Sequence, residues 1–305
     1  MSSVSRTPAW QRRDTGLTIR MILSFAILAL LYVVFLSVLA YVGLGIIPIT
    51  IIASLMVLAQ WYFSDKIVLW SSGAKIVTRD QFPKLHDMVE RIVARNNLSK
   101  PKIAVVNTSM PNAFATGKDR KSSVVAVTTG LLDILDDPEE LESVIAHELT
   151  HIRNRDALVL TLVSILPTIA WYLIQIGFYG GLYGGMGYGR DRNNGGIMII
   201  VIVVAVLVWI ISFLIIRAIA RYREFSADRG AVQLTGKPVK LANALMKISG
   251  NMRRVPTKDL RQVEGLNAFF IIPAISGSTI GNLFSTHPPV EKRIQKLMEM
   301  EASMS

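Results

Sequence analysis

His147-Glu148-Leu149-Thr150-His151 is the stretch on which the interpretation of this 305-residue chain depends. On a helix, positions i and i+4 lie on one face, so both imidazoles can bind one metal ion while Glu148 lies beside it. Zinc takes neutral nitrogen donors, and a catalytic zinc site keeps one position open for water. Because the chain has only 4 histidines, chance explains this spacing poorly. The stretch predicts a zinc site and a catalytic base on one helix.

Four long apolar stretches dominate the chain. They account for a hydrophobic content of 51% and a mean hydropathy of +0.42. Each is close to the roughly 20 residues that cross a bilayer as a helix. A cleaved signal peptide does not explain the first, which is too long and lacks a following cleavage site. We therefore expect four transmembrane helices at about residues 17–40, 44–63, 157–181 and 197–216.

The charges predict an orientation and a division into four parts. Basic residues before the first span favour a cytoplasmic N-terminus, which puts both termini and the two long polar segments in the cytoplasm. The expected parts are a tail with two spans (1–63), a first cytoplasmic segment with the motif helix (64–156), two spans with an external glycine-rich loop (157–216) and a second cytoplasmic segment with a further metal ligand (217–305). Most of the net charge of +11 follows from this topology. It does not indicate nucleic-acid binding, although the basic last part could lie against anionic lipid.

Short β-type runs precede the motif. They cover residues 103–106, 112–117 and 123–128, and polar residues 118–121 suit a hairpin turn. We expect an α+β membrane protein with four transmembrane helices and a mostly helical, zincin-like cytoplasmic domain that contains a small antiparallel sheet. An edge of that sheet can bind an extended peptide as an added strand. Asp137 and Pro138 supply an N-cap and a first helical residue for the motif helix.

A third metal ligand is expected after the fourth span. Glu224 and Asp228 are four residues apart and share one helix face. We interpret Glu224 as the third ligand and Asp228 as an acceptor that orients a ligating histidine. The alternative is that these carboxylates form salt bridges with Arg221 or Arg229. The absence of cysteine excludes disulfides, cysteine-ligated zinc and a thiol nucleophile.

Three further features have open interpretations at this point. His86 has no ligand-type partners nearby and suits a surface or interface position better than a metal site. The apolar group 269–273 could belong to the core, dip into the membrane or cover the cleft. His287, before two prolines, is either a capping residue or a functional one.

Together these pieces resemble the HtpX group of membrane-embedded zinc metalloproteases, relatives of the CAAX prenyl endopeptidases. The matching stretches, in chain order, are Asn112-Ala113-Phe114-Ala115-Thr116-Gly117, the 147–151 motif, Glu224-Phe225-Ser226-Ala227-Asp228, and Ser285-Thr286-His287-Pro288-Pro289 with Arg293. The resemblance implies that Glu224 is the third zinc ligand and that Asn112, His287 and Arg293 have active-site roles. It also implies a part in membrane-protein quality control and the stress response.

The function expected from the residues and the resemblance is that of a zinc endopeptidase with one Zn²⁺ per chain. His147, His151 and Glu224 would hold the ion, and Glu148 would act as general base on its water. His287, helped by Asn112, would stabilise the developing oxyanion. Arg293 would position Asp228 or Glu224. The substrate would lie along the edge strand formed by Ala113, Phe114, Ala115 and Thr116.

The expected partners are the lipid bilayer and unfolded or damaged membrane proteins. Two alternatives stay open on sequence alone. One is dedicated maturation of a single substrate, such as a prenylated or signal-bearing chain. The other is a non-enzymatic membrane scaffold in which the metal is structural and has four protein ligands. The sequence predicts neither the cleavage preference nor the oligomeric state.

Overall fold

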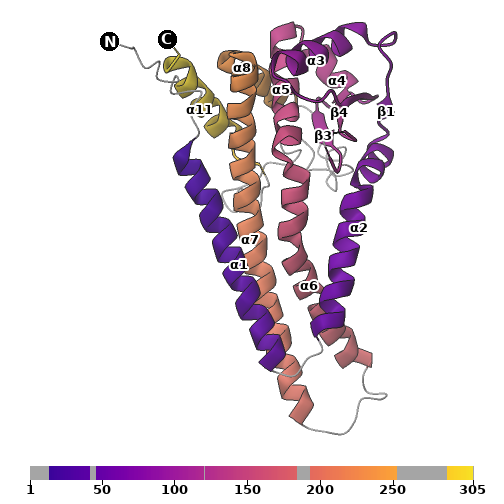
Figure 1. The fold of residues 1–305 in the computed structure, drawn as a ribbon, viewed down its shortest axis with the longest axis vertical. Coiled ribbons are helices and arrows are strands. Elements are labelled where there is room, and N and C mark those ends of the chain that lie inside the picture. Colours follow the sequence, from indigo (N-terminus) through magenta and orange to yellow (C-terminus); the bar gives the residue numbers. More distant parts are fainter. Residues whose placement is uncertain (1–13, 42–45, 120, 184–192, 253–286, 305) are drawn as a thin grey trace. The chain divides into compact units, whose positions relative to one another are not determined.

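A computed structural model describes residues 14–41, 46–119, 121–183, 193–252 and 287–304. The chain divides into two compact units. The helical unit comprises Ile19–Tyr62 and Leu158–Ile219, and the sheet-bearing unit comprises Met1–Thr18, Phe63–Ala157 and Ala220–Ser305. Four of the elements in Figure 1, α1, α2, α6 and α7, contribute residues to both units.

The helical unit is built from long apolar helices. They are α1 (Thr15–Tyr41), α2 (Ile46–Ser72), α6 (Asp156–Tyr183) and α7 (Asn193–Thr235). Within the described residues, these four are long and apolar enough to cross a membrane, which confirms the predicted number of spans. Phe35, Leu166 and Ala205 are fully buried in its core, whereas Ile22 and Leu30 are more than 60% exposed. An apolar core inside an apolar surface is the pattern of a helix bundle in lipid.

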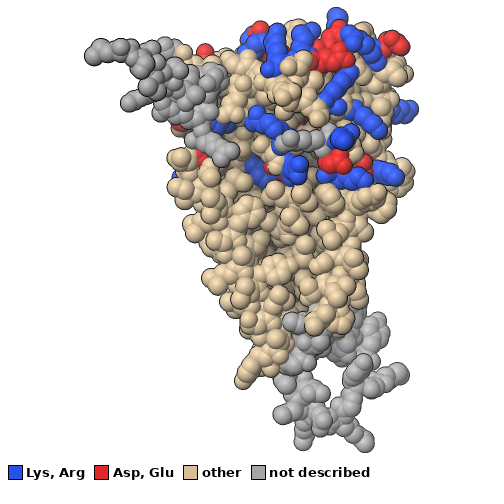
Figure 2. Space-filling view, viewed as in Figure 1, with Lys and Arg blue, Asp and Glu red and all other residues tan. Residues whose placement is uncertain are grey.

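On the face drawn in Figure 2, charged side chains gather over the sheet-bearing unit, and the described part of the helical unit shows almost none. The sheet-bearing unit contains strands β1 (Lys75–Ile76), β2 (Lys102–Val106), β3 (Ala113–Thr116) and β4 (Val124–Thr128). Its other elements are α3 (Pro83–Arg95), α4 (Thr129–Ile134), α5 (Pro138–Asn154), α8 (Pro238–Met252), α11 (Val290–Ala302) and the last part of α7.

The sheet has the order β1-β2-β4-β3 and is mixed. β3 and β4 form the predicted antiparallel hairpin, and β1 is antiparallel to β2. The prediction of a wholly antiparallel sheet is wrong, because β2 pairs with β4 in parallel. The reason is the order of the strands along the chain. After β2 the chain first forms β3 at the edge of the sheet. The hairpin then brings β4 back between β2 and β3, where it runs in the same direction as β2.

The two faces of the sheet have separate apolar cores, since successive side chains point to opposite faces. One face joins the core that includes α3, α5 and α8; its residues are Ile103, Val105, Ala113, Val125 and Val127. The other face packs against Val68 near the end of α2; its residues are Ala104, Val106, Phe114, Val124 and Ala126. Each fully buried valine or isoleucine contributes about 1.5–3 kcal/mol. The sheet is therefore a firm support for α5.

The motif helix α5 begins as predicted but ends abruptly. The Asp137 side chain accepts a hydrogen bond from the Glu139 amide at 2.8 Å, and Pro138 is the first helical residue. At the other end Arg155 is left-handed, with φ 57° and ψ 41°, and α6 starts at the next residue, Asp156. The sequence predicted that α5 would run almost directly into the third span. The helices are indeed consecutive, but this left-handed residue separates them.

One sequence-predicted feature lies outside the described residues. The apolar group at 269–273 falls in the range 253–286, so its three interpretations stay as they were.

Candidate metal centre

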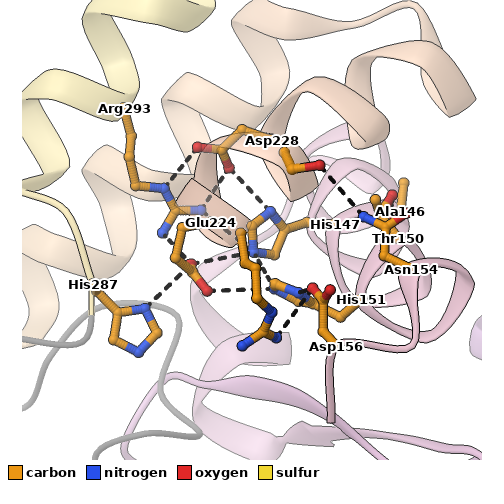
Figure 3. Close-up of polar contacts among 12 residues, drawn as sticks. Ala146, His147, Thr150, His151, Asn154, Asp156, Glu224, Asp228, His287 and Arg293 are labelled. Carbon is orange, nitrogen blue, oxygen red and sulfur yellow. Dashed lines mark hydrogen bonds and ion pairs between the residues drawn. The ribbon is translucent and has the colours of Figure 1, made fainter. Parts of the chain in front are cut away.

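Three donor groups from two helices converge in the sheet-bearing unit. His147 and His151 project from one face of α5, and their Nε2 atoms lie 3.2 Å apart. The Glu224 carboxylate, from α7, lies 3.6 Å from Nε2 of His147 and 3.5 Å from Nε2 of His151. One ligand atom from each of the three lies within 4.8 Å of the others. The structure thus brings together the three residues that the sequence singled out as ligands (Figure 3).

The outer nitrogens of the two imidazoles face carboxylates. Nδ1 of His147 lies 3.0 Å from Oδ1 of Asp228, and Nδ1 of His151 lies 2.5 Å from Oδ2 of Asp156. A neutral imidazole that donates its Nδ1 proton to a carboxylate has a lone pair on Nε2. Two such lone pairs 3.2 Å apart repel each other unless a positive charge lies between them.

The donor set therefore fits a divalent metal ion, and zinc in particular. Two imidazole nitrogens and one carboxylate form a mixed set that zinc accepts. It leaves a fourth position for water, as in catalytic sites. Each histidine also has the outer carboxylate that ligating histidines usually have.

Arg293 joins the centre from α11. Its Nε and Nη2 atoms donate to the two carboxylate oxygens of Asp228 at 2.8 and 2.6 Å, and its Nη1 lies 3.3 Å from Oε2 of Glu224. The Arg293 side chain is 1% exposed. Burial lowers the pKa of the guanidinium, but Asp228 and Glu224 outweigh this effect and raise the pKa further above its ordinary value. Arg293 is thus a permanent positive charge that holds one carboxylate in a fork geometry.

Two side chains of the motif have shifted proton equilibria. Burial lowers the pKa of His147, but the hydrogen bonds to Asp228 and Glu224 outweigh it and raise the pKa to about 9. Without a metal ion, His147 therefore carries a proton at neutral pH. Burial raises the pKa of the Glu148 carboxyl, and the neighbouring His147 and His151 act in the opposite direction. A buried carboxyl with a raised pKa is suited to general acid–base work near neutral pH.

His287 lies just before α11 and reaches the same carboxylate. It is 6% exposed, and its Nδ1 lies 3.2 Å from Oε2 of Glu224. The structure therefore places His287 at the centre.

The predicted peptide-binding strand is β3. In the described sheet it pairs on one side only, with β4, and it packs beside α5. Asn112, directly before it, is 4% exposed. Its backbone amide donates to Oγ1 of Thr128 at 2.8 Å, and its carbonyl accepts from the amide of Thr128 at 2.9 Å. These bonds hold the start of β3 firmly in the sheet.

Two residues near the centre were missed by sequence reasoning. Asp156 contacts His151, and Arg223 lies 3.1 Å from the same Asp156 oxygen. A usable signal was present, because the second histidine of the motif also needs an acceptor for its outer nitrogen. The fourth histidine, His86, belongs to another part of the unit; it is buried, not on the surface, and its Nε2 lies 3.2 Å from the Val77 carbonyl oxygen.

Comparisons with known proteins agree on one group. The sequence profile described as Peptidase family M48 matches residues 79–301. The protein named Protease HtpX homolog 2 of Methanosarcina mazei is 54% identical over 296 residues, which cover 97% of this chain and 99% of the relative. Protease HtpX homolog of Moorella thermoacetica is 51% identical over 292 residues, or 95% of this chain and 96% of the relative.

A solved structure has a similar fold. The crystal structure of S. mikatae Ste24p aligns with 93% of this chain at a TM-score of 0.54 and 17% sequence identity. This chain spans 65% of the length of that chain. At this identity the likeness concerns the fold alone.

Proposed function

Because this chain belongs to peptidase family M48 and is an HtpX-type multi-pass membrane metalloprotease, we propose that it is a zinc endopeptidase that cleaves unfolded or damaged membrane proteins on the cytoplasmic side. His147, His151 and Glu224 would hold one zinc ion. The observation that carries this proposal is the convergence of these three donors on α5 and α7. Family membership sets aside the non-enzymatic scaffold.

A zinc ion in this centre would supply a Lewis acid that makes a water molecule acidic and polarises a peptide carbonyl. Glu148, between the two histidines in the motif, takes a proton from that water and passes it to the leaving amine. Its buried carboxyl holds a proton more firmly than an exposed glutamate does, which suits the second of these transfers. His147 and His151 would hold the ion through Nε2, because Nδ1 of each faces a carboxylate, Asp228 and Asp156 respectively.

Two further residues would stabilise negative charge on the reacting carbonyl oxygen. His287, in contact with Glu224, would donate a hydrogen bond to that oxygen. Asn112, at the start of β3, would assist it. Arg293 would act one step further out, through the Asp228 and Glu224 carboxylates that it contacts.

The substrate would bind as an extended segment along β3, from Ala113 to Thr116. Main-chain hydrogen bonds of this kind tolerate many side chains, which fits a protease for damaged proteins. An unfolded cytoplasmic loop or tail can adopt the extended form, whereas a folded domain cannot. This selection by conformation would separate damaged membrane proteins from intact ones.

The direct test uses purified full-length protein in detergent, metal analysis and cleavage of an unfolded protein such as casein. We expect one zinc per chain in the wild type. Glu148→Gln should retain the zinc and lose cleavage by several orders of magnitude, whereas His147→Ala should lose both. Normal proteolysis by zinc-loaded Glu148→Gln would contradict the mechanism.

The substrate class needs a separate experiment. In a deletion strain complemented with Glu148→Gln, many membrane proteins should accumulate relative to the strain with the wild-type gene. Quantitative proteomics of the membrane fraction measures this accumulation. Accumulation of a single precursor would instead indicate dedicated maturation.

A further inference from the structure

His151 has a carboxylate partner of its own at the first residue of α6. Its Nδ1 lies 2.5 Å from Oδ2 of Asp156, and Nη2 of Arg223 lies 3.1 Å from the same oxygen. Asp156 is 4% exposed and Arg223 is 8% exposed. These contacts link three residues in a row: the buried Arg223 contacts the buried Asp156, which contacts the partly buried His151.

The same order of residue types stands behind the other histidine. Arg293 contacts Asp228, and Asp228 contacts Nδ1 of His147. Figure 3 draws Asp228 beside His147 and Asp156 beside His151. The two sets of contacts differ in detail, because Arg293 binds both oxygens of Asp228 while Arg223 contacts one oxygen of Asp156.

The backbone conformation at Arg155 is what places Asp156 behind His151. Arg155 has a φ of 57°, and its amide bonds to the carbonyls of His151 and Ile152 to end α5. A left-handed residue that is not glycine costs about 1–3 kcal/mol and persists only where surrounding contacts require it. The next residue is then Asp156, which starts a new helix while its side chain contacts the last histidine of the previous one.

We propose that Asp156 and Arg223 are a positioning pair for His151: Asp156 accepts the Nδ1 proton and so directs Nε2 at the metal, and Arg223 fixes the orientation of Asp156. This proposal rests on the zinc site of the proposed function. It assigns neither residue a contact with substrate. Outer partners of ligating histidines typically change metal affinity or activity by about 10–100-fold.

The first test measures zinc affinity in full-length, metal-free protein in detergent, by competition with a chromophoric chelator. Asp156→Asn should bind Zn²⁺ about 10–100-fold more weakly than the wild type. The visible spectrum of the Co²⁺-loaded variant should also change, because His151 is no longer held in one orientation. The matched control is Glu142→Gln, which removes a carboxylate of α5 that is also paired with a cation, Lys237 at 2.8 Å; its zinc affinity should stay at the wild-type value.

The second test asks whether Arg223 acts through Asp156. Arg223→Gln should weaken zinc binding less than Asp156→Asn, and it should have little further effect in the Asp156→Asn background. Equal effects of Arg223→Gln in both backgrounds would contradict the pairing. If Asp156→Asn does not fold, as judged by thermal unfolding of the metal-free protein, Arg223→Gln alone still tests the proposal through its zinc affinity.

The outcomes separate this inference from the proposed function. A wild-type protein that binds no zinc would contradict the proposed function itself. A wild-type protein that binds one zinc ion, with Asp156→Asn and Arg223→Gln within twofold of it and with unchanged Co²⁺ spectra, would overturn the positioning pair alone.

Discussion

Arg293 is the side chain in the metal centre with the strongest set of ionic contacts. It is fully enclosed and holds Asp228 through two hydrogen bonds while its third nitrogen faces Glu224. Breaking a buried pair is costly because the remaining charge is left without a partner in a poorly solvated site. Single residues at this centre therefore influence stability as well as chemistry.

We expect Arg293→Gln to lower the free energy of unfolding of the metal-free protein by about 3–5 kcal/mol. Thermal unfolding in detergent, followed by tryptophan fluorescence, measures this. The matched control is Lys240→Gln, which breaks the more exposed contact with Asp137 at 2.7 Å. An unfolding midpoint for Arg293→Gln that equals that of Lys240→Gln would contradict the energetic role of the buried fork.

A second residue-scale prediction concerns the proton on His147. Its pKa of about 9 without metal means that zinc must displace a proton below this pH. Metal affinity should therefore rise with pH, by about tenfold per unit at most, and level off near pH 9. Zinc competition titrations between pH 6.5 and 9.5 measure the slope.

Asp228→Asn supplies the control for this pH dependence. Without the Asp228 carboxylate, the pKa of His147 falls, so the affinity should level off at a lower pH. A zinc affinity that is independent of pH between 7 and 9 in the wild type would show that His147 is already neutral there.

The residues of the centre were unequally predictable from sequence. His147, Glu148 and His151 follow from local helical spacing, and Glu224 and Asp228 from a second such spacing. Asp156 was missed because its contact depends on one left-handed residue, Arg155, which has no signature of its own in the sequence. Arg223 was missed because its contact at the centre is with Asp156, which was itself missed.

At the scale of helices, the approach of α5 and α7 in the sheet-bearing unit is set by a glycine. A Cβ atom added to Gly230 would lie 2.2 Å from Cγ2 and 2.7 Å from Oγ1 of Thr150. Thr150 is part of the metal-binding motif, and Gly230 lies six residues after Glu224. The spacing of the two ligand-bearing helices thus depends on the absence of a side chain at this position.

We expect Gly230→Ala to weaken zinc binding at least tenfold, because the clash requires a shift of more than about 1 Å to reach ordinary carbon contact distances. Zinc competition and cleavage assays both measure the loss. The double variant Gly230→Ala with Thr150→Ala should recover much of the affinity, since it removes the clashing atoms. Gly250→Ala is the matched control, because nothing lies within 4 Å of its added Cβ. Wild-type affinity in Gly230→Ala would contradict the tight approach.

Among the helices and strands, features that depend on neighbours in sequence were predicted, and features that depend on distant segments were not. The hairpin of β3 and β4 and the cap of α5 depend on neighbours in sequence, and both were predicted. The parallel pairing of β2 with β4 was not, because it depends on where the chain returns after β3. The apolar span to about residue 216 and the helix face with Glu224 and Asp228 were both predicted, but as separate features. The structure joins them in one helix, α7, which continues to Thr235.

At the scale of the whole molecule, the absence of cysteine makes the predicted topology directly testable. Single cysteines can be introduced at exposed positions of each unit and labelled with a membrane-impermeant maleimide. Gly196, at the start of α7, and Ser99, before β2, are both exposed. With the sheet-bearing unit in the cytoplasm, Gly196→Cys should label in intact cells and Ser99→Cys only after permeabilisation.

The cysteine-free wild type is the background control, and both variants should retain protease activity. Labelling of Ser99→Cys in intact cells, without labelling of Gly196→Cys, would reverse the orientation. The four spans themselves were predictable because apolar length is a property of the sequence alone. The side of the membrane depends on an energetic bias from loop charges, so it needs this measurement.

The division of the metal centre between α5, α7 and α11 has a consequence for how the enzyme is made. A ribosome synthesises His147, Glu148 and His151 first, then two membrane helices, and only afterwards Glu224, Asp228 and Arg293. A nascent chain that has reached α6 holds two histidines and a base but neither the third ligand nor the arginine fork. Under the proposed mechanism, peptidase chemistry would therefore begin late in biogenesis, after the membrane segments have been made, and a half-made copy would not attack the proteins being inserted beside it.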